Sequence, residues 1–304
     1  MPKPTQEYPS PLIFPPTSGN HETTLIVLHG RGSSAEKFAA PLLEHLVSPR
    51  STTSLEPQPQ TFQSHFPNTK FIFPTASRRR AVAYNRSFTH QWFDMYPLDQ
   101  YPPEYREHIQ HPGLKESAEF VHGLLAKAIE EVGAKNVVLM GLSQGCAIGL
   151  TSLLLWRGEE LNGFVGMCGW LPLRKSMAEV LKDTEEVREE DEDNPFEEDA
   201  FQEDKTKLEH TVDWLREELD FPSPASIAEG EKKTLFNETP LFLGHGTEDP
   251  KVPYQLGKQS TEFLNNIGVD VTWKEYPGLG HWYSEDMLRD IVEWLKNREG
   301  KNLV

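Results

Sequence analysis

The sequence predicts an α/β fold, with a mostly parallel central sheet and helices on both of its faces. Short apolar runs of strand-like composition alternate along the chain with segments in which apolar residues recur every three or four positions. This alternation is typical of a parallel sheet whose strands are joined by helices. No internal repeat is visible, and 304 residues are enough for one large domain. We therefore expect a single domain over residues 1–304.

Six runs are predicted to be strands, because each is short, apolar and rich in β-branched or aromatic residues. They cover residues 25–29, 70–73, 136–140, 163–168, 240–244 and 271–276.

Helices are predicted between these strands. The clearest covers residues 114–132, where apolar residues recur at steps of three and four and Gly133 stands at the position of a C-terminal cap. Pro253 is expected at the first position of a helix that reaches Gly268, and a last helix is expected at 285–297.

The composition indicates where the protein works. Hydrophobic residues make up 37% of the chain, no apolar stretch is long enough to span a membrane, and the first four residues lack the features of a secretory leader. The two cysteines, Cys146 and Cys168, are expected to be buried free thiols. No cysteine or histidine cluster has the spacing of metal ligands. We therefore expect a cytoplasmic protein without a metal or organic cofactor.

The net charge of −17 is concentrated in one segment. Residues 185–204 contain twelve carboxylates and one arginine, which leaves about −6 for the rest of the chain. Nucleic-acid binding is disfavoured because no long basic stripe is present. The tract belongs to an insertion at about 175–236. We expect the tract to be mobile, because it cannot bury enough apolar surface to offset its ordering entropy.

Two further segments interrupt the alternation of strands and helices. Within the insertion, residues 206–219 are predicted to form an amphipathic helix, with leucines and a valine at steps of four, three and four. Its apolar face must pack either on the core or over the mouth of the site, where it would act as a lid. Residues 48–65 are rich in Ser, Thr, Pro and Gln and are predicted to form a surface loop.

A candidate nucleophile lies in residues 141–145, which read Gly-Leu-Ser-Gln-Gly. This Gly-x-Ser-x-Gly sequence stands between a predicted strand and a predicted helix. A serine on so sharp a turn takes a strained backbone conformation that exposes its hydroxyl, and side chains at the flanking glycines would collide with neighbouring backbone. On these five residues alone, an ordinary turn serine is the alternative.

A nucleophilic serine needs a base and a third group that orients the base. Asp249 follows the predicted strand at 240–244, and His281 follows the one at 271–276. Both are therefore expected in loops at the carboxyl edge of the sheet, where the end of the strand before Ser143 also lies. The order Ser, Asp, His is the one that a nucleophile elbow in such a sheet requires.

Other residues compete for these two roles. His29 and His245 also follow predicted strands, but each precedes a glycine in a tight turn, where an imidazole usually fixes the loop. Glu248 is an alternative to Asp249, and Asp249 itself suits an Asx turn before Pro250.

Acyl transfer also requires two backbone N–H groups that face the developing oxyanion. The amide of Gln144 is one candidate, because it lies at a helix N-terminus, where the dipole favours negative charge. Arg31, between Gly30 and Gly32 in the loop after the first predicted strand, is the other. The alternative is that these two glycines only turn the chain into the next helix.

Taken together, the motifs resemble the acyl-protein thioesterase and carboxylesterase branch of the α/β-hydrolases, also called the phospholipase/carboxylesterase family. The resemblance covers about residues 25–175 and 237–298. Besides the elbow, the stretches that carry it are 28–32 (Leu-His-Gly-Arg-Gly), 73–76 (Phe-Pro-Thr-Ala), 91–94 (Gln-Trp-Phe-Asp), 169–172 (Gly-Trp-Leu-Pro), 245–253 and 280–281 (Gly-His).

The resemblance implies an α/β-hydrolase fold and a serine hydrolase that cleaves acyl esters or thioesters, with S-acylated proteins and lysophospholipids among the substrates. It implies no cofactor. It assigns Ser143 as the nucleophile, Asp249 as the orienting acid, His281 as the base, and the amides of Arg31 and Gln144 as oxyanion donors. Substrate contacts are expected from Trp92, Phe93, Trp170, Leu171 and Trp282.

Some features depart from the family or leave alternatives open. The insertion is longer than the resemblance implies. Arg78-Arg79-Arg80, together with Arg86, forms either a solvated basic turn or a site for an anionic substrate group. Alternative functions are a small-ester carboxylesterase or dienelactone-hydrolase-like enzyme, and a catalytically silent hydrolase scaffold that binds a basic partner through its acidic insertion. Lipid anchoring has no support at the N-terminus, and the sequence leaves open whether the chain dimerises.

Overall fold

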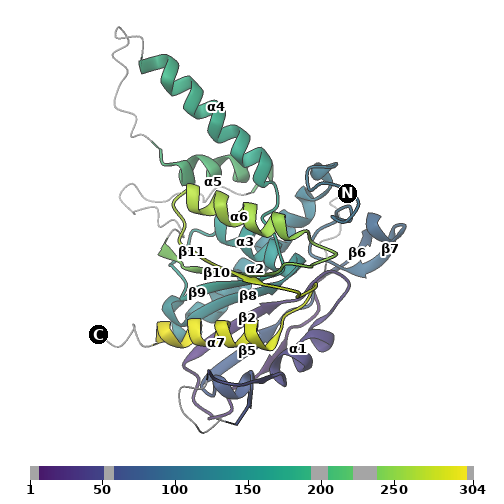
Figure 1. Cartoon of the computed structure of the whole chain (residues 1–304), viewed down its shortest axis with the longest axis vertical. Helices are drawn as coiled ribbons and strands as arrows, with labels where there is room; N and C mark the ends of the chain where they lie inside the picture. The colour runs from purple at the N-terminus through teal and green to yellow at the C-terminus, as the bar shows by residue number, and fades with distance from the viewer. Residues whose placement is uncertain (1–6, 51–57, 193–204, 222–237, 300–304) are drawn as a thin grey trace.

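A seven-stranded sheet lies at the centre of the structure, in the strand order β1-β5-β2-β8-β9-β10-β11 (Figure 1). Neighbouring strands are parallel, except that β1 pairs antiparallel with β5. The computed structural model describes residues 7–50, 58–192, 205–221 and 238–299. The strands of this sheet are β1 (Leu12–Phe14), β2 (Thr23–Leu28), β5 (Thr69–Phe73), β8 (Val137–Leu142), β9 (Gly163–Met167), β10 (Leu241–Gly246) and β11 (Val271–Tyr276).

All six predicted strands are present, which confirms the prediction of a mostly parallel sheet. The central strands are apolar at almost every position because helices cover both faces of the sheet. In β2, Leu25 and Val27 pack with one layer of helices, while Ile26 and Leu28 pack with the other. The carboxyl ends of the parallel strands therefore meet at one protected edge.

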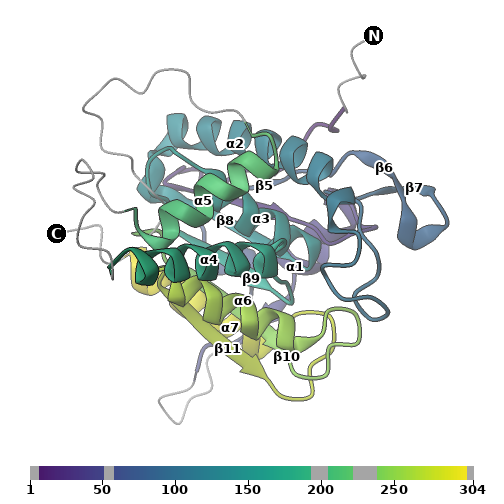
Figure 2. The ribbon, with the colours of Figure 1, turned by 90° about the horizontal axis from the view of Figure 1, so that it is seen from above.

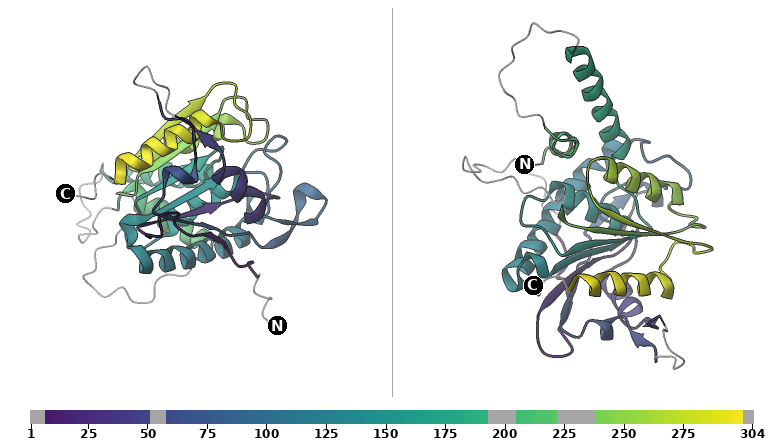
Figure 3. Two further views of the ribbon diagram at one scale, coloured as in Figure 1. Left: turned by 90° about the horizontal axis from the view of Figure 1, so that it is seen from below. Right: turned by 60° about the vertical axis from the view of Figure 1, so that its left-hand side comes forward.

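Helices form a layer on each face of the sheet (Figure 3). α1 and α7 pack on one face, and α2, α3 and α6 pack on the other, with α4 and α5 outside them. The helices are α1 (Ala35–Leu43), α2 (His111–Val132), α3 (Gln144–Leu155), α4 (Arg174–Glu192), α5 (Lys207–Glu218), α6 (Tyr254–Asn266) and α7 (Glu285–Glu299). Short 3₁₀ turns occur at Gln63–His65, Val82–Tyr84, Glu107–Ile109 and Ala134–Asn136.

The three predicted framework helices are present, with small differences at their ends. Gly133 caps α2 with φ 79°, a left-handed conformation that glycine adopts without steric cost. Pro253 is the N-cap of α6 and not its first helical residue, so the predicted start is one position too early.

Helix α5 packs on the core and not over a site. Thr206 and Glu209 form a capping box at its start, and its apolar face is buried. Arg216 of α5 donates to the carbonyl of Leu155 over 2.9 Å, at the far end of α3 from its N-terminus. Figure 2 shows α5 alongside α2, α3 and α4.

The acidic tract begins as a helix. Its first eight residues continue α4, which projects from the body of the molecule (Figure 1). The remaining part, residues 193–204, lies outside the described residues, so the prediction of a mobile tract stays a prediction there.

The predicted surface loop at 48–65 is wrong for its second half. Two short strands, β3 (Leu46–Val47) and β4 (Gln60–Thr61), pair antiparallel. The Phe62 that follows is fully buried among neighbouring aromatic rings. The polar composition of the segment conceals this buried aromatic anchor. Residues 51–57 lie outside the described part of the chain.

A second hairpin, formed by β6 (Arg78–Ala81) and β7 (Ser87–His90), carries the arginine cluster and stands away from the sheet (Figure 2). Arg79 pairs with Glu116, and the guanidinium of Arg80 lies over the ring of Phe88.

Among the described residues, no helix is both long and apolar enough to cross a membrane.

Candidate active site

Ser143 occupies the sharp turn between β8 and α3, with φ 57° and ψ −120°. A positive φ is costly for a residue with a Cβ atom, and such strain is typical of functional turns. The flanking glycines are required by close backbone approach. A Cβ on Gly141 would lie 2.3 Å from the carbonyl oxygen of Gly145, and a Cβ on Gly145 would lie 2.2 Å from that of Leu28.

The structure brings Ser143, His281 and Asp249 into one hydrogen-bonded line. The Nε2 of His281 lies 2.9 Å from the Oγ of Ser143, and its Nδ1 lies 2.7 Å from the Oδ2 of Asp249. The three residues follow β8, β11 and β10, whose carboxyl ends share one edge of the sheet. The geometry suits a serine whose proton passes to an oriented imidazole.

The carboxylate of Asp249 is fully buried yet held in its charged form. Burial alone would raise its pKa, but hydrogen bonds from His245, His281 and the backbone N–H of Val252 outweigh this and bring the pKa well below its ordinary value. Glu248, the alternative acid, is exposed, and no hydrogen bond joins it to His281 among the described residues. The geometry therefore favours Asp249.

His29, one of the alternative bases, is a buried structural residue. Its Nδ1 bonds to the carbonyl of Gly30, and its Nε2 accepts from the N–H of Ala76. Burial lowers its pKa to about 4, so the imidazole stays neutral. It fixes the loop after β2 and does not reach Ser143.

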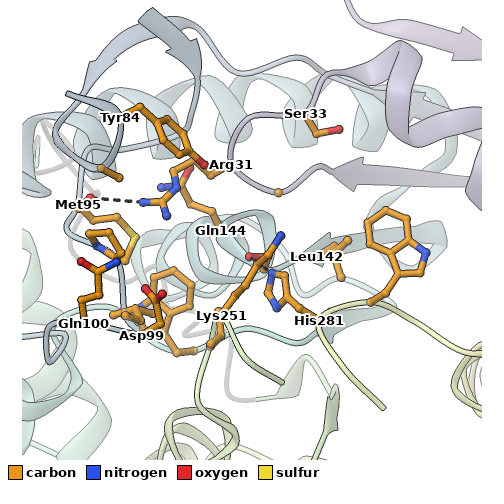
Figure 4. A pocket seen from close by; sticks show the side chains of 18 of the residues that line it. Arg31, Ser33, Tyr84, Met95, Asp99, Gln100, Leu142, Gln144, Lys251 and His281 are labelled. Atoms are coloured by element: carbon orange, nitrogen blue, oxygen red, sulfur yellow. Dashed lines mark hydrogen bonds between the residues drawn. The ribbon is translucent and has the colours of Figure 1, made fainter. Parts of the chain in front are cut away.

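A pocket of about 370 Å³ opens onto Ser143 (Figure 4). One part of its wall is apolar and comes from several separate loops and helices, and another part carries charged groups. The apolar side chains are Phe38, Ala83, Met95, Pro97, Leu98, Leu142, Trp170, Val252 and Trp282, and the charged ones are Arg31, Asp99 and Lys251.

The two predicted oxyanion donors both lie on this wall. Gln144 is the first residue of α3, and the N–H groups of a first helical turn have no acceptor within the helix. Its side chain is locked, because Oε1 accepts from the N–H of Trp92 over 2.9 Å and Nε2 donates to the carbonyl of Phe93 over 2.8 Å. The Arg31 guanidinium donates to the carbonyl of Met95.

The predicted substrate contacts divide into two groups. Trp170 and Trp282 line the pocket, but Trp92, Phe93 and Leu171 do not. Trp92 and Phe93 have no exposed surface, and Leu171 is 2% exposed. Their apolar character reflects core packing, so the structure corrects the expectation for these three.

Several pocket residues were not found from the sequence. Met95, Leu98 and Asp99 come from an irregular segment, Tyr84 from the β6–β7 hairpin, and Lys251 from the loop of the acid. Of these, only Lys251 lies in a stretch that carries the resemblance, at 245–253, and nothing in that stretch signals a role for its side chain. The other segments reach the pocket only in the folded chain. The arginines at 78–80 and 86 do not line the pocket, and α5 contributes none of its residues either.

The two cysteines of the chain are buried and are held as neutral thiols. Cys146 and Cys168 are free and buried, as predicted. Burial raises the pKa of the Cys168 thiol to about 12 and raises that of Cys146 further, which keeps both neutral. Within the described ranges, no group of three or more His, Cys, Asp or Glu side chains is arranged to hold a metal ion.

Comparison with known proteins agrees with this geometry. Residues 13–198 and 221–298 match the phospholipase/carboxylesterase family. Acyl-protein thioesterase 1 of Gibberella zeae is 25% identical over 290 residues, 95% of each chain. The carboxylesterase SOBER1 of Arabidopsis thaliana is 27% identical over 242 residues, 79% of this chain and 82% of the relative.

The fold is shared with solved structures. The crystal structure of Zea mays acyl-protein thioesterase 2 has a TM-score of 0.61 at 22% identity and covers 96% of this chain and 99% of its own. The family match extends over most of the sequence and includes the elbow and the loops of Asp249 and His281. The chain belongs to the phospholipase/carboxylesterase family of α/β-hydrolases.

Proposed function

We propose that the protein hydrolyses carboxylic esters or thioesters of acyl chains through an acyl-enzyme formed on Ser143. The observation that carries the proposal is the continuous line from the Oγ of Ser143 through His281 to the buried carboxylate of Asp249. Removal of the serine proton by an adjacent imidazole is what makes a hydroxyl nucleophilic at neutral pH.

The reaction follows from the positions of these groups. His281 accepts the proton of Ser143 as the hydroxyl attacks the substrate carbonyl, and the negative charge on the carbonyl oxygen is met by the N–H groups of Arg31 and Gln144. The imidazolium then protonates the departing alcohol or thiol. A water molecule, deprotonated by His281, attacks the acyl-enzyme and releases the acid and the free serine. Asp249 holds the tautomer of His281 and stabilises the imidazolium.

The substrate class is inferred from the pocket and from the relatives. An acyl chain suits the apolar wall formed by Met95, Leu98 and Trp170. Relatives named acyl-protein thioesterase support S-acylated proteins as substrates, and lysophospholipids are a further candidate. Two buried free thiols support a reducing, cytosol-like compartment.

An organophosphonate probe that reacts with activated serines tests the nucleophile. We expect labelling of the wild-type protein and none of Ser143→Ala, with His281→Ala also unlabelled because its serine is not activated. Equal labelling of wild type and Ser143→Ala would refute the proposal. A silent scaffold, the alternative of another class, predicts no labelling of any variant.

A series of p-nitrophenyl esters and matching thioesters of increasing acyl length tests the substrate class. We expect kcat/KM to rise with chain length as the acyl group fills the apolar wall. A maximum at acetate, with activity lost by about eight carbons, would instead support the small-ester alternative.

A further inference from the structure

A second histidine contacts the carboxylate of Asp249. His245, the penultimate residue of strand β10, has its Nε2 3.2 Å from the Oδ2 of Asp249 and 3.1 Å from the carbonyl oxygen of Val252. The same Oδ2 lies 2.7 Å from the Nδ1 of His281. One carboxylate oxygen is therefore shared by two imidazoles, of which only His281 reaches Ser143.

The surroundings determine the tautomer of His245. Both neighbours of its Nε2 are acceptors, so this nitrogen carries the proton and donates it. The ring is 1% exposed and closely enclosed, since a Cβ on Gly257 would lie 2.4 Å from its Nδ1. Rings of Tyr254 and Trp273 flank it, each with its centroid 6.2 Å away. The imidazole is thus held in one place and cannot rotate to serve another partner.

The other oxygen of Asp249 is fixed by the backbone. Its Oδ1 accepts from the N–H of Lys251 over 2.8 Å and from that of Val252 over 2.9 Å. These two bonds leave the carboxylate free to tilt on the Oδ2 side, where His281 and His245 are its only polar partners in the part of the chain that the structure describes. His281 lies in a different loop and moves a proton during the reaction, whereas His245 belongs to the rigid sheet.

We propose that His245 is a positioning residue, which donates from Nε2 to Asp249 and holds Oδ2 in line with the Nδ1 of His281. It acts behind the triad and does not line the pocket. The proposal rests on the serine-hydrolase function of Ser143, and the labelling of wild type and Ser143→Ala decides that function separately.

Two substitutions of His245 distinguish the loss of its N–H donor from the loss of the volume of its ring. His245→Gln keeps an N–H donor near the position of Nε2, and His245→Met fills similar space without a donor. We expect His245→Met to lose about 10- to 100-fold in kcat, the cost of one charge-assisted hydrogen bond, with KM nearly unchanged. We expect His245→Gln to recover most of this loss. His122→Met is the matched control, because His122 is also partly buried and bonds to a backbone carbonyl, that of Ser152, but neither contacts the triad by a hydrogen bond nor lines the pocket.

The pH profile distinguishes positioning from a loss of packing. The acidic limb of kcat/KM reports protonation of His281 in the free enzyme. Without the donor of His245, more of the carboxylate charge acts on the imidazolium, so the limb of His245→Met moves to higher pH, and that of His245→Gln stays near wild type. Equal losses in both variants with an unmoved limb, or a kcat for His245→Met within about twofold of wild type, would overturn the proposal.

A measurement on the wild-type protein keeps the test valid if a variant fails to fold. In ¹⁵N NMR we expect His245 to be protonated on Nε2 and bare on Nδ1. The opposite tautomer would refute the assignment, since such a ring could not donate to Asp249.

A different observation, the charge on the pocket wall, supports a second inference. Among the described residues, Lys251 has no ion-pair partner, although it lines the pocket beside His281 (Figure 4). Arg31 adds a second positive group on this wall, against the single carboxylate of Asp99. The pocket is therefore locally cationic in a protein of net charge −17.

We infer that Lys251 forms an anion subsite, so that the preferred ester or thioester carries a carboxylate near its scissile bond. An exposed ammonium at the mouth of the pocket attracts such a group. This inference deepens the proposed function and depends on it. The carboxylate belongs either to the acyl part or to the leaving group.

Matched substrate pairs test the subsite and its two sources. The acyl arm compares the p-nitrophenyl half-ester of glutaric acid with p-nitrophenyl valerate. The leaving-group arm compares the butyrate ester of 4-hydroxybenzoate with that of 4-hydroxybenzamide. In one arm we expect wild type to favour the carboxylate by about 5- to 20-fold in kcat/KM at low salt, as for one partly screened charge pair.

Variants of Lys251 identify the group responsible. Lys251→Met should abolish the preference and Lys251→Glu should reverse it, while Lys251→Arg retains it and hydrolysis of the neutral members persists in all three. A wild-type ratio near one in both arms, or a preference that survives Lys251→Met, would overturn the subsite. Absence of hydrolysis of any substrate by wild type would instead count against the proposed function.

Discussion

The side chain of Gln144 is bonded at both ends to the backbone of Trp92 and Phe93, which precede it by about fifty residues in the chain. These bonds tie the first turn of α3, next to Ser143, to the loop that forms one side of the pocket. An oxyanion donor must be held in place before the charge develops, because movement during the reaction would consume its stabilising effect.

Replacing Gln144 with leucine removes both bonds. The N–H of Trp92 and the carbonyl of Phe93 would remain buried without partners, so we expect the free energy of unfolding to fall by about 2–4 kcal/mol. Urea denaturation measures this change. Gln255→Leu serves as the control, since Gln255 is exposed on α6. An equal effect of the two substitutions would contradict the role given to Gln144.

The elbow glycines provide a prediction based on steric contact. A Cβ on Gly145 would meet backbone atoms of Leu28 and His29, which cannot rotate away. We therefore expect Gly145→Ala to lower the free energy of unfolding by at least about 3 kcal/mol and to abolish activity, because the strand and helix must separate.

Gly123 is the matched control for this substitution. It is exposed in the interior of α2, and a Cβ there meets nothing within 4 Å. Gly123→Ala should stabilise the protein by about 0.5–1 kcal/mol through helix propensity and the entropy of the unfolded chain. Thermal melts of both variants measure the two changes, and destabilisation by Gly123→Ala would contradict the open space at this position of α2.

Because α5 packs on the core, we expect a substitution on its buried face to lower the free energy of unfolding without changing the substrate preference. Leu215 is 1% exposed in the core that α5 shares with α3. Leu215→Ala should cost about 2–5 kcal/mol, whereas Glu217→Ala on the exposed face should have little effect. At a temperature where Leu215→Ala is folded, its dependence of kcat/KM on acyl length should equal that of wild type. An altered dependence would instead support a lid.

Buried histidines predict a loss of stability in mild acid. Burial lowers the pKa of His29 and of His122 to about 4 in the folded protein, against about 6.5 for an exposed imidazole. The unfolded chain therefore binds protons that the folded chain excludes. Above about pH 6.5 the two histidines take nothing from the free energy of unfolding. As the pH falls from there toward 4, each histidine lowers the free energy of unfolding by up to about 3 kcal/mol.

Denaturation at a series of pH values checks this prediction. Asp249 does not interfere in the same window, because its pKa is lowered and its contribution is lost only below the ordinary carboxyl range. His122→Gln should flatten the pH dependence between 6.5 and about 4.5. A dependence equally steep in the variant would show that His122 does not titrate as its burial requires.

Much of the proposed catalytic line could be predicted from the sequence, because its residues are tied to local backbone patterns. Ser143, Asp249 and His281 each follow an apolar run, and parallel strands bring their carboxyl ends to one edge of the sheet whatever the loops contain. The glycines around Ser143 and Arg31 can be interpreted locally, because tight turns favour glycine for steric reasons. Helices α2 and α6 are predicted to within a few residues, because the spacing of apolar residues along each helix is also a local pattern.

Residues whose position depends on contacts between distant segments could not be predicted. Trp92 and Trp170 both lie within motif stretches and both are buried, yet only Trp170 lines the pocket. Hydrophobicity reports burial in either place and does not distinguish them. Phe62 shows the converse, since one buried ring anchors a segment of otherwise polar composition.

The sequence by itself determined the framework of this protein, namely a parallel sheet, a serine on a strained turn, and an aspartate and a histidine after later strands in the order that the proposed triad requires. Periodicity and local sterics suffice for these features because each depends on neighbours in the chain. Only the tertiary structure decided that α5 packs on α3, that His245 shares the oxygen of Asp249 with His281, and that Lys251 faces the pocket. These features depend on how layers and loops pack together, and no local pattern records that packing.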